Sequence, residues 1–592
     1  MCGFAGEIAR DGERPDMDAL ARASAVLEPR GPDGHGAWSE GRIGLAHRRL
    51  SIIDLSEGGA QPMVRDDLAI VFNGCIYNHH ELRAELRELG QPMTTTSDTE
   101  VILAAYRQWG PEGFLDHLIG MFAFAIVERA SGRVLLGRDR LGIKPLYLAE
   151  TPGGGLRFAS TLPALLAAGG VDTALDPVAL QRYFSFHSVV PAPATILRGV
   201  RRLAPATTLT IEPSGERTER RWWAPPYERR PEHDGWSFED WSEAILEKLR
   251  VAVRRRMVAD VPVGVLLSGG LDSSMIVAIL AEQGQRDLAT YSIGFPDANG
   301  REGNEFRYSD LMAERFATNH HKIALEEHEV VDVLRDAVRA MSEPMVSHDV
   351  VAFHLLSREV AKDIKVVQSG QGADEVFAGY SWYPPLRDAE GVGDDVYASE
   401  FIDTTWAQRD EELTAPWHLD EDVAMAFVRE QFARPGADTP LDRALRLDTE
   451  VMLVDDPVKR VDNMTMAWGL EARVPFLDHE LVELAAACPP EHKLALDGKG
   501  VLKQGARGLV PDEVIDREKG YFPVPLISQM SDVALELVRE VLSSEPARAR
   551  GLYEPGPVER MLAAPNEVRT TLDSNRLWQL ALLELWLQEH GI

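Results

Sequence analysis

The chain has 592 residues, of which 45% are hydrophobic, so at least two hydrophobic cores and hence two domains are expected. Its 62 Lys and Arg residues stand against 94 Asp and Glu residues, and the formal net charge of −32 argues against a nucleic-acid partner, because it would repel a phosphate backbone. The N-terminus lacks the pattern of a signal peptide, and no run approaches the roughly 18 apolar residues of a membrane span. We therefore expect a cytoplasmic protein without a membrane partner.

Three cysteines, Cys2, Cys75 and Cys488, occur without any C-x-x-C spacing, which argues against a zinc cluster and against a disulfide framework. The neighbouring pairs His79/His80 and His320/His321 predict no metal site either, because adjacent side chains point apart on a regular element. The acidic stretch 390–405 lacks the spaced ligands of a calcium loop and is predicted to be a solvated loop.

Up to about residue 210, short β-rich segments alternate with helical stretches such as 81–89, which predicts a layered α+β domain over residues 2–211. Residues 212–236 are rich in Pro, Arg and Glu and show neither helical nor strand periodicity, so we assign them to an interdomain linker. Beyond them, strand-like runs at 261–267, 289–295, 320–325 and 365–370 are each followed by helix-forming sequence. This alternation predicts an α/β domain over 237–592 with a doubly wound parallel sheet, and helices are expected to pack around it from about residue 440.

The first candidate site begins at Cys2. Once the initiator methionine is removed, its α-amine lies close to its own thiol, so one residue can supply both nucleophile and base. Position alone is also compatible with an ordinary N-terminal residue. However, five motifs follow in order: MCGFAGEI at the start, RGPDG at 30–34, HRRLSIIDL at 47–55, NGCIYN at 73–78 and SDTE at 97–100. Together they resemble the glutaminase domain of class II glutamine amidotransferases, which implies an N-terminal-nucleophile hydrolase fold with αββα layers.

This resemblance implies that Cys2 attacks the side-chain amide of glutamine while Asn73 and the backbone of Gly74 form an oxyanion hole. It further implies a glutamine-binding set in which Arg49 binds the α-carboxylate and Asp98 the α-ammonium, together with Leu50, Ser51, Ile52, Ile53, Asn73, Gly74 and Cys75. A surface ion pair is the alternative for Arg49 and Asp98. The family usually has an acidic residue where this chain has Cys75, so the ammonium contact there is expected to be weaker or made by a backbone carbonyl. We expect the Cys75 side chain itself to be small and buried.

The second candidate site lies in residues 261–280, which predict a buried strand, a glycine-rich turn and a helix beginning near Ser273. Backbone amides at such a turn face an anion at the positive end of the helix. The segment SGGLDSS fits neither the Walker pattern nor G-x-G-x-x-G, and it resembles the pyrophosphate loop of ATP pyrophosphatases. A purely structural turn is the alternative. The resemblance implies ATP and Mg²⁺ as cofactors, with phosphate contacts from Ser268, Gly269, Gly270, Ser273 and Ser274 and with Asp272 directed toward the metal.

A second motif, SGQGADEVFAGY at 369–380, follows the next predicted strand. Within it, Asp374 is the first candidate to complete the coordination of Mg²⁺, and Glu375 is the second. With the segments 460–479 and 517–525, both motifs resemble the synthetase domain of asparagine synthetases, so the resemblance covers nearly the whole chain. It implies that Leu266, Ile293, Ser369 and Gly370 frame the adenosine and that Lys519 stabilises charge on the adenylated intermediate. Lys459 and Arg473 would support the wall of the site.

Two departures from asparagine synthetases concern the acceptor. Gln371 stands where the family generally has a glutamate thought to assist ammonia attack, and a neutral amide cannot accept that proton. Residues 343–357 also lack the usual Asp-Pro-Ser-like pattern. These variants most closely resemble the N-acetylglutaminylglutamine amidotransferase branch, whose product is a dipeptide amide that acts as an osmolyte. Trp382 and Tyr383 either line the larger pocket that such an acceptor needs or belong to the core.

The expected partners are glutamine, ATP and a carboxylate acceptor, and a homodimer is compatible with the sequence. Because free ammonia would be lost to solvent, coupling of two sites implies an internal passage between the domains. The nearest rival is an asparagine synthetase acting on aspartate. A sulfurtransferase acting on tRNA would need reactive cysteines near the loop and a basic surface, and neither is present. A non-catalytic paralogue that senses glutamine or nucleotide is a third alternative.

Overall fold

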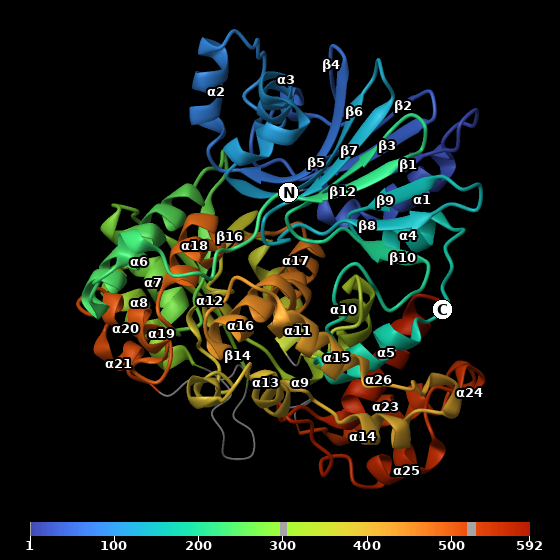
Figure 1. The fold of residues 1–592 in the computed structure, drawn as a ribbon, viewed down its shortest axis with the longest axis vertical. Coiled ribbons are helices and arrows are strands. Elements are labelled where there is room, and N and C mark those ends of the chain that lie inside the picture. Colours follow the sequence, from blue (N-terminus) through green and yellow to red (C-terminus); the bar gives the residue numbers. More distant parts are fainter. Residues whose placement is uncertain (1, 296–304, 348, 518–528) are drawn as a thin grey trace.

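The computed structural model describes residues 2–295, 305–347, 349–517 and 529–592 (Figure 1). Two six-stranded sheets stack in the N-terminal part of the chain. The first sheet has the order β10-β8-β9-β1-β3-β2 and consists of β1 (Cys2–Ile8), β2 (Gly34–Glu40), β3 (Ile43–Arg49), β8 (Tyr147–Glu150), β9 (Leu156–Ala159) and β10 (Val200–Arg202). The second has the order β12-β11-β7-β6-β5-β4 and consists of β4 (Met63–Arg65), β5 (Leu68–Ile76), β6 (Gly120–Glu128), β7 (Arg133–Arg138), β11 (Thr207–Ile211) and β12 (Arg217–Arg221).

The two sheets bury a common apolar layer that includes Phe4, Leu45, Val71, Ala125 and Phe158. Helices α1 (Met17–Val26) and α4 (Leu162–Ala168) cover the outer face of the first sheet, and α2 (His79–Glu88) and α3 (Asp98–His117) cover that of the second. Both faces of each sheet are largely buried, because one face packs on the other sheet and the opposite face packs on helices. The predicted αββα layering is confirmed.

The segment 212–236, for which no strand was predicted, contains one: Arg217–Arg221 form β12. These five residues pair antiparallel with β11 and continue the second sheet at its edge. All five are exposed, so the strand carries no apolar alternation that sequence reasoning could detect. Main-chain hydrogen bonds to β11 define it instead.

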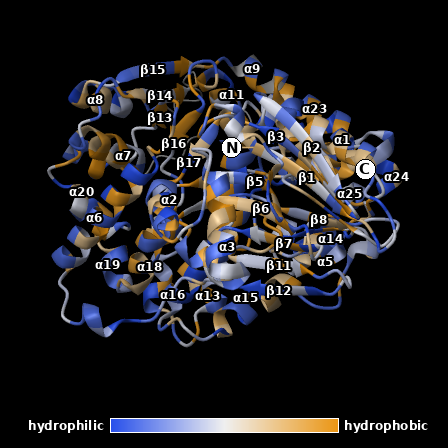
Figure 2. Cartoon of the chain, turned by 90° about the horizontal axis from the view of Figure 1, so that it is seen from above, coloured by the Kyte–Doolittle hydropathy of each residue, from blue (hydrophilic) through white to orange (hydrophobic). Residues whose placement is uncertain are grey.

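A five-stranded parallel sheet organises the C-terminal part, in the order β15-β14-β13-β16-β17, which confirms the predicted α/β architecture. Its strands are β13 (Val263–Leu266), β14 (Ala289–Gly294), β15 (Asn319–Ala324), β16 (Val366–Gln368) and β17 (Glu471–Arg473). The edge strand β15 is largely polar and appears blue in Figure 2. The other edge strand, β17, lies in the region from about 440 onward for which only helices were expected, and its three residues are too few to show a period.

The other helices lie around and beside this sheet, and among them α5 comes from the N-terminal half of the chain and packs against α15 (Figure 1). They are α5 (Pro177–Ser185), α6 (Phe238–Arg255), α7 (Leu271–Glu282), α8 (Phe306–Phe316), α9 (Glu327–Asp332), α10 (Leu334–Ala340), α11 (Asp349–Val360), α12 (Ala373–Phe377), α13 (Asp394–Phe401), α14 (Trp406–Glu412), α15 (Val423–Ala433), α16 (Pro440–Leu447), α17 (Lys459–Met466), α18 (His479–Ala487), α19 (Pro490–Leu494), α20 (Gly500–Ala506), α21 (Asp512–Ile515), α23 (Asp532–Leu542), α24 (Glu545–Arg550), α25 (Pro555–Ala563) and α26 (Arg576–Glu589). None of the helices in the described ranges is long and apolar enough to cross a lipid bilayer.

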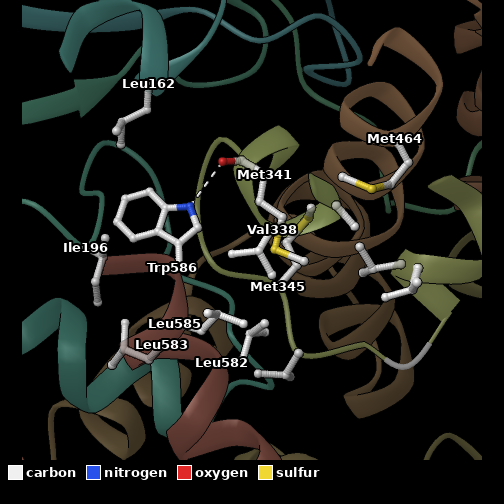
Figure 3. Packing of buried hydrophobic residues seen from close by; sticks show 14 of the residues in the cluster. Leu162, Ile196, Val338, Met341, Met345, Met464, Leu582, Leu583, Leu585 and Trp586 are labelled. Atoms are coloured by element: carbon white, nitrogen blue, oxygen red, sulfur yellow. Dashed lines mark hydrogen bonds between the residues drawn. The ribbon is translucent and has the colours of Figure 1, made fainter. Parts of the chain in front are cut away.

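The two halves of the chain share a core around α26. Figure 3 shows Trp586 of this helix between Leu162 and Ile196 of the N-terminal half and Met341 of the C-terminal half, to whose carbonyl oxygen its indole N–H donates a hydrogen bond of 3.1 Å. A buried ion cluster also joins the halves: the Asp462 carboxylate accepts from Arg30 at 2.9 Å and from Lys144 at 3.0 Å. Ion pairs so fully buried need both partners, so the halves are fixed against each other.

Candidate active sites

Cys2 and Asn73 meet where β1 and β5 pack together. The backbone N–H of Cys2 donates to Oδ1 of Asn73 at 3.1 Å. Asn73 is fully buried, and its Nδ2 has no hydrogen-bond partner among the described residues, so one amide donor is free beside the cysteine. A Cβ on Gly74 would lie 2.1 Å from the carbonyl oxygen of Met121, which explains why glycine follows the asparagine. The structure thus brings together the predicted nucleophile and the predicted oxyanion donors.

Burial raises the pKa of the Cys2 thiol, although a hydrogen bond from the backbone of Leu50 and the charge of Arg49 act in the opposite direction. A thiol in this environment stays protonated at neutral pH and needs a nearby base before it can attack. The α-amine of a processed Cys2 is such a base, because it belongs to the same residue.

A cavity of about 30 Å³ opens beside Cys2. It is lined by Cys2, Arg49, Leu50, Ile52, Ile53, Gly59, Gln61, Phe72, Gly74, Cys75, Ser97, Asp98, Thr99 and Glu471. Ser51 is the one residue of the predicted glutamine-binding loop 49–53 that does not line it, and its backbone N–H donates instead to Asp33 at 2.7 Å. Glu471 was not predicted and comes from the C-terminal half of the chain.

Arg49 is held as a buried cation at the wall of this cavity. Its guanidinium donates to the carbonyl oxygens of Ser56, at 2.8 Å, and Asp54. A Cβ on Gly59 would lie 2.1 Å from Nη2, so the glycine makes room for the guanidinium. The side chain is 9% exposed and forms no ion pair with any residue that the structure describes, which argues against the surface ion-pair alternative.

Asp98 and Cys75 lie on the same cavity. Asp98 begins α3 and accepts from the backbone N–H of Ile76 at 3.1 Å, and burial raises the pKa of its carboxyl to about 6. Cys75 is 1% exposed, and burial raises the pKa of its thiol. Its Sγ lies 3.6 Å from Nη2 of Arg473, so the position that is usually acidic in the family contacts a cation of the C-terminal half.

The second candidate site occupies the carboxyl ends of the parallel strands, where ligands bind in open α/β sheets. The turn between β13 and α7 positions Ser268, whose Oγ accepts from the N–H of Gly270 at 3.3 Å and lies 3.2 Å from Oγ of Ser273. Gly269 has a φ of 77°, and a Cβ there would lie 2.7 Å from the N of Ser309. Helix α7 begins at Leu271, two residues before the predicted start, so its N-terminus faces the turn as an anion site requires.

Asp272 and Asp374, the predicted metal ligands, converge on a lysine. Nζ of Lys499 lies 2.7 Å from Oδ2 of Asp272 and 2.9 Å from Oδ1 of Asp374. Burial alone would lower the pKa of Lys499, but the two carboxylates outweigh it and raise that pKa above its usual value. Sequence reasoning missed this lysine. Its one local signal is its place between two glycines, at the N-cap of α20 with a φ of 54°.

The two loops approach each other closely because of small residues. A Cβ on Gly370 would lie 2.9 Å from Cβ of Asp272, and one on Gly379 would lie 2.1 Å from Oδ1 of Asp374. Of the predicted adenosine residues, Leu266 is the last residue of β13, Ile293 is the last but one of β14, and Ser369 follows β16 directly. Ser274 is fully buried in α7. The structure therefore gathers these predicted ATP-binding residues at the carboxyl ends of the parallel strands.

Comparisons with known proteins cover both sites. Residues 1–223 match the family model described as glutamine amidotransferase domain, and residues 244–588 match the one described as asparagine synthase. The chain is 31% identical to asparagine synthetase [glutamine-hydrolyzing] 3 of Bacillus subtilis, over 95% of this chain and 93% of the relative. It is 32% identical to a putative asparagine synthetase [glutamine-hydrolyzing] of Mycobacterium tuberculosis, over 100% of this chain and 98% of the relative. It is 29% identical to asparagine synthetase B [glutamine-hydrolyzing] of Escherichia coli, over 93% of this chain and 88% of the relative.

The chain belongs to the asparagine synthetase family. Members of this family are ATP-dependent, glutamine-hydrolysing ligases that form amides.

In this asparagine synthetase family member, a second cation borders the turn between β13 and α7. Nη2 of Arg517 lies 3.7 Å from the place of a Cβ on Gly270, pairs with Glu305 at 2.9 Å, and its guanidinium lies 4.6 Å from the ring centroid of Tyr308. The predicted cation Lys519 lies outside the described residues. Sequence reasoning passed over Arg517, although it stands in the same motif.

The residues that were predicted around the acceptor are placed as follows. Gln371 is half-buried in the turn between β16 and α12. Tyr383 is fully buried and donates to Asp448 at 2.5 Å, so it belongs to the core, whereas Trp382 is half-buried and stacks on Tyr380 at 4.1 Å. Lys459 is buried, with its Nζ 3.9 Å from Oε1 of Glu343.

Proposed function

We propose that this family member hydrolyses glutamine at Cys2 and uses the ammonia to amidate the carboxylate of N-acetylglutaminylglutamine after ATP has adenylated it. The observation that carries the two-site proposal is the pairing of Cys2 with Asn73 in one half of the chain and of Lys499 with Asp272 and Asp374 in the other. We assign residues 2–211 to the glutaminase domain and 237–592 to the synthetase domain, with β12 in the connecting segment.

In the glutaminase step, the α-amine of Cys2 takes the proton of the thiol and Sγ attacks the side-chain carbonyl carbon of glutamine. The oxygen of the tetrahedral intermediate then accepts from Nδ2 of Asn73 and from the N–H of Gly74. The α-ammonium of Cys2 returns the proton to the amide nitrogen, so that collapse of the intermediate breaks the C–N bond, releases ammonia and leaves a thioester on Cys2, which water hydrolyses to glutamate. Arg49 and Asp98 orient the substrate through its α-carboxylate and α-ammonium groups.

In the synthetase step, the acceptor carboxylate attacks the α-phosphorus of ATP and pyrophosphate leaves. The turn before α7 and the side chain of Arg517 hold the phosphates. Asp272 and Asp374 offer hard oxygen ligands for Mg²⁺, which when bound would neutralise charge on the departing pyrophosphate. Since the structure shows no group of three or more metal-ligating side chains in its described ranges, the phosphates and water would supply the remaining ligands.

Two features support a passage for ammonia inside the molecule. The cavity beside Cys2 is lined by Glu471 of the synthetase half, so it borders the contact between the halves. The buried cluster of Arg30, Lys144 and Asp462 fixes that contact and keeps it dry.

The choice of acceptor rests on Gln371 and on residues 343–357. Gln371 cannot serve as the general base that the family's glutamate is thought to provide. Ser347 in the second segment accepts from Arg460 of α17 at 2.6 Å, and Asp349 pairs with the same arginine at 3.2 Å. This is a specific anchoring of the segment that departs from asparagine producers. Aspartate is the second candidate acceptor, favoured by the names of the relatives.

The test is the identity of the product. Purified protein is incubated with glutamine, Mg-ATP and either N-acetylglutaminylglutamine or aspartate, and the products are identified by mass spectrometry. An amidated dipeptide supports the proposal, whereas asparagine restores the second candidate. Cys2→Ala should abolish glutamine use and spare the use of ammonium salts, and loss of both activities would contradict the two-site scheme.

A further inference from the structure

A glutamate of the synthetase domain reaches the glutamine cavity. Glu471 begins β17, its side chain is 1% exposed, and it lines the same cavity as Cys2 and Asp98. In the described part of the chain it is the only lining residue that comes from the synthetase domain. It is thus the one point where that domain would touch a substrate bound at Cys2.

The carboxylate of Glu471 is held in place and charged. Nε of Arg473 donates to its Oε1 at 2.5 Å, and Nη1 of Arg473 donates to the carbonyl oxygens of Arg256 and Val258, both at 2.8 Å. Burial alone would raise the pKa of Glu471, but the surrounding positive charges, that of Arg473 foremost and that of Lys144 among the others, together outweigh burial and bring that pKa to about 2. The backbone is also fixed, because the N–H of Glu471 donates to Lys365 at 2.7 Å. Side chains locked in this way are suited to substrate recognition.

Residue 75, which is usually acidic in the family, brings no acidic side chain to the cavity in this chain. The position after the Asn-Gly pair is Cys75, a neutral thiol whose Sγ contacts Nη2 of Arg473 at 3.6 Å. The same arginine therefore touches Cys75 on one side and holds Glu471 on the other. In this chain an acidic group reaches the cavity through β17 and not from residue 75.

The charges around the cavity match a free α-amino acid. One guanidinium, of Arg49, and two carboxylates, of Asp98 and Glu471, line a single small cavity. The charge of Glu471 is among the factors that raise the pKa of Asp98, so the two carboxylates disfavour each other's ionised forms. A cation between them relieves this repulsion. The α-ammonium of glutamine is the cation that the proposed reaction brings.

We propose that Glu471 completes the glutamine pocket from the opposite domain and, with Asp98, receives the α-ammonium group of the substrate. This inference rests on the proposed hydrolysis of glutamine at Cys2. Glutamine binding then requires that the two domains are docked. The same short strand also carries the carbonyl oxygen of Arg473, which accepts from the N–H of Ser369 at 2.8 Å, so one strand borders both the glutamine pocket and the nucleotide site.

The test compares glutamine with glutaric acid monoamide, which lacks only the α-amino group. Glu471→Gln keeps the size of the side chain and a hydrogen-bond acceptor for Arg473 but removes the charge. The KM for glutamine should rise about tenfold or more, as expected for the loss of one charge-assisted contact. The kcat/KM of glutaric acid monoamide should change little, so that the preference of the wild type for glutamine collapses. An equal loss with both substrates indicates a structural role and would overturn the inference.

Three further variants complete the experiment. Glu471→Asp keeps the charge one methylene shorter and should give an intermediate preference, which also covers the case in which Glu471→Gln does not fold. Glu480→Gln is the matched control, since Glu480 lies on α18 in a half-exposed pair with Lys248, and it should retain the wild-type preference. Cys2→Ala separates the two hypotheses. If it retains glutaminase activity, the proposed function fails; if it loses that activity while Glu471→Gln keeps the preference, only this inference fails.

Discussion

Nζ of Lys499 lies 2.7 Å from Oδ2 of Asp272, a residue 227 positions earlier in the chain. Asp374 lies on the other side of the same ammonium group, at 2.9 Å. The lysine therefore links the loop after β13 to the loop after β16 and supplies a positive charge where phosphates are expected. A buried ammonium with two carboxylates remains protonated, so it can donate hydrogen bonds to charge that develops during adenylation.

Lys499→Met should lower the rate of amide formation about a hundredfold or more, because a preorganised charge next to the reacting phosphate is lost. The release of glutamate from glutamine should continue, since the cavity at Cys2 does not include this lysine. Both rates are measured with the acceptor identified in the product assay. Lys503→Met is the control: Lys503 is half-buried and donates to Leu496. A parallel fall of both rates would contradict the assigned role.

Asn73→Ala should lower the kcat of glutamine hydrolysis about a hundredfold or more, as the loss of one oxyanion donor does in other enzymes. The free Nδ2 of Asn73 beside Cys2 is the reason for this expectation. Synthesis from ammonium salts should be retained. Asn78→Ala serves as the control, because Asn78 does not line the cavity at Cys2: its Nδ2 donates to the carbonyl of His117 and its Oδ1 accepts from the N–H of Ile119, both at 2.9 Å. A kcat for Asn73→Ala within a few-fold of the wild type would exclude Asn73 from the oxyanion hole.

The affinity for glutamine should fall as the pH drops through about 6. Burial raises the pKa of Asp98 to about 6, and only the ionised carboxylate can bind the α-ammonium group. The KM for glutamine should therefore rise about tenfold for each pH unit below this value. Asp98→Asn should raise the KM at pH 8 and remove this dependence. A pH profile that is unchanged in the variant would assign the titration to another group.

Asp98 should also make the stability of the folded protein depend on pH, in the direction opposite to the affinity for glutamine: stability should fall as the pH rises. Its pKa in the folded state is raised above the unfolded value, so the folded state binds more protons between pH 3.8 and about 6 and loses stability as the pH rises through this range. Asp98→Asn is thus expected to be at least as stable as the wild type at pH 7, which thermal melts can check.

Asp462→Ala should destabilise the protein by about 3–5 kcal/mol, because it leaves Arg30 and Lys144 buried without their partner. Burial alone would raise the pKa of Asp462, but these two cations outweigh it and lower that pKa. The stabilisation is therefore present above pH 3.8 and is lost as the pH falls through the folded-state pKa. Urea unfolding at pH 7 measures the effect. Asp310→Ala removes a half-exposed pair with Lys322 and should change stability by less than about 1 kcal/mol.

The class of fold could be predicted from the sequence alone, as could most of the candidate residues that the structure brings together at each site. Alternation of apolar runs with helical stretches predicts the parallel sheet, because each strand there is covered on both faces. Cys2, Asn73, Gly74 and Asp272 stand in short motifs, and the resemblance of these motifs to known families was enough to single them out as candidates. Strand β12 was missed because it is exposed on both faces and is held only by main-chain pairing with β11.

Contacts between a motif and residues far away in the chain are known only from the folded structure. Lys499 is recognisable only when the chain brings α20 against two loops, since no local pattern relates it to Asp272 or Asp374. Glu471 lines the glutamine cavity only because the two halves dock through the Asp462 cluster and the core around Trp586. Electrostatic and packing contacts depend on distance in space, and sequence motifs record distance along the chain. Residues that act across a domain contact are therefore visible only after folding.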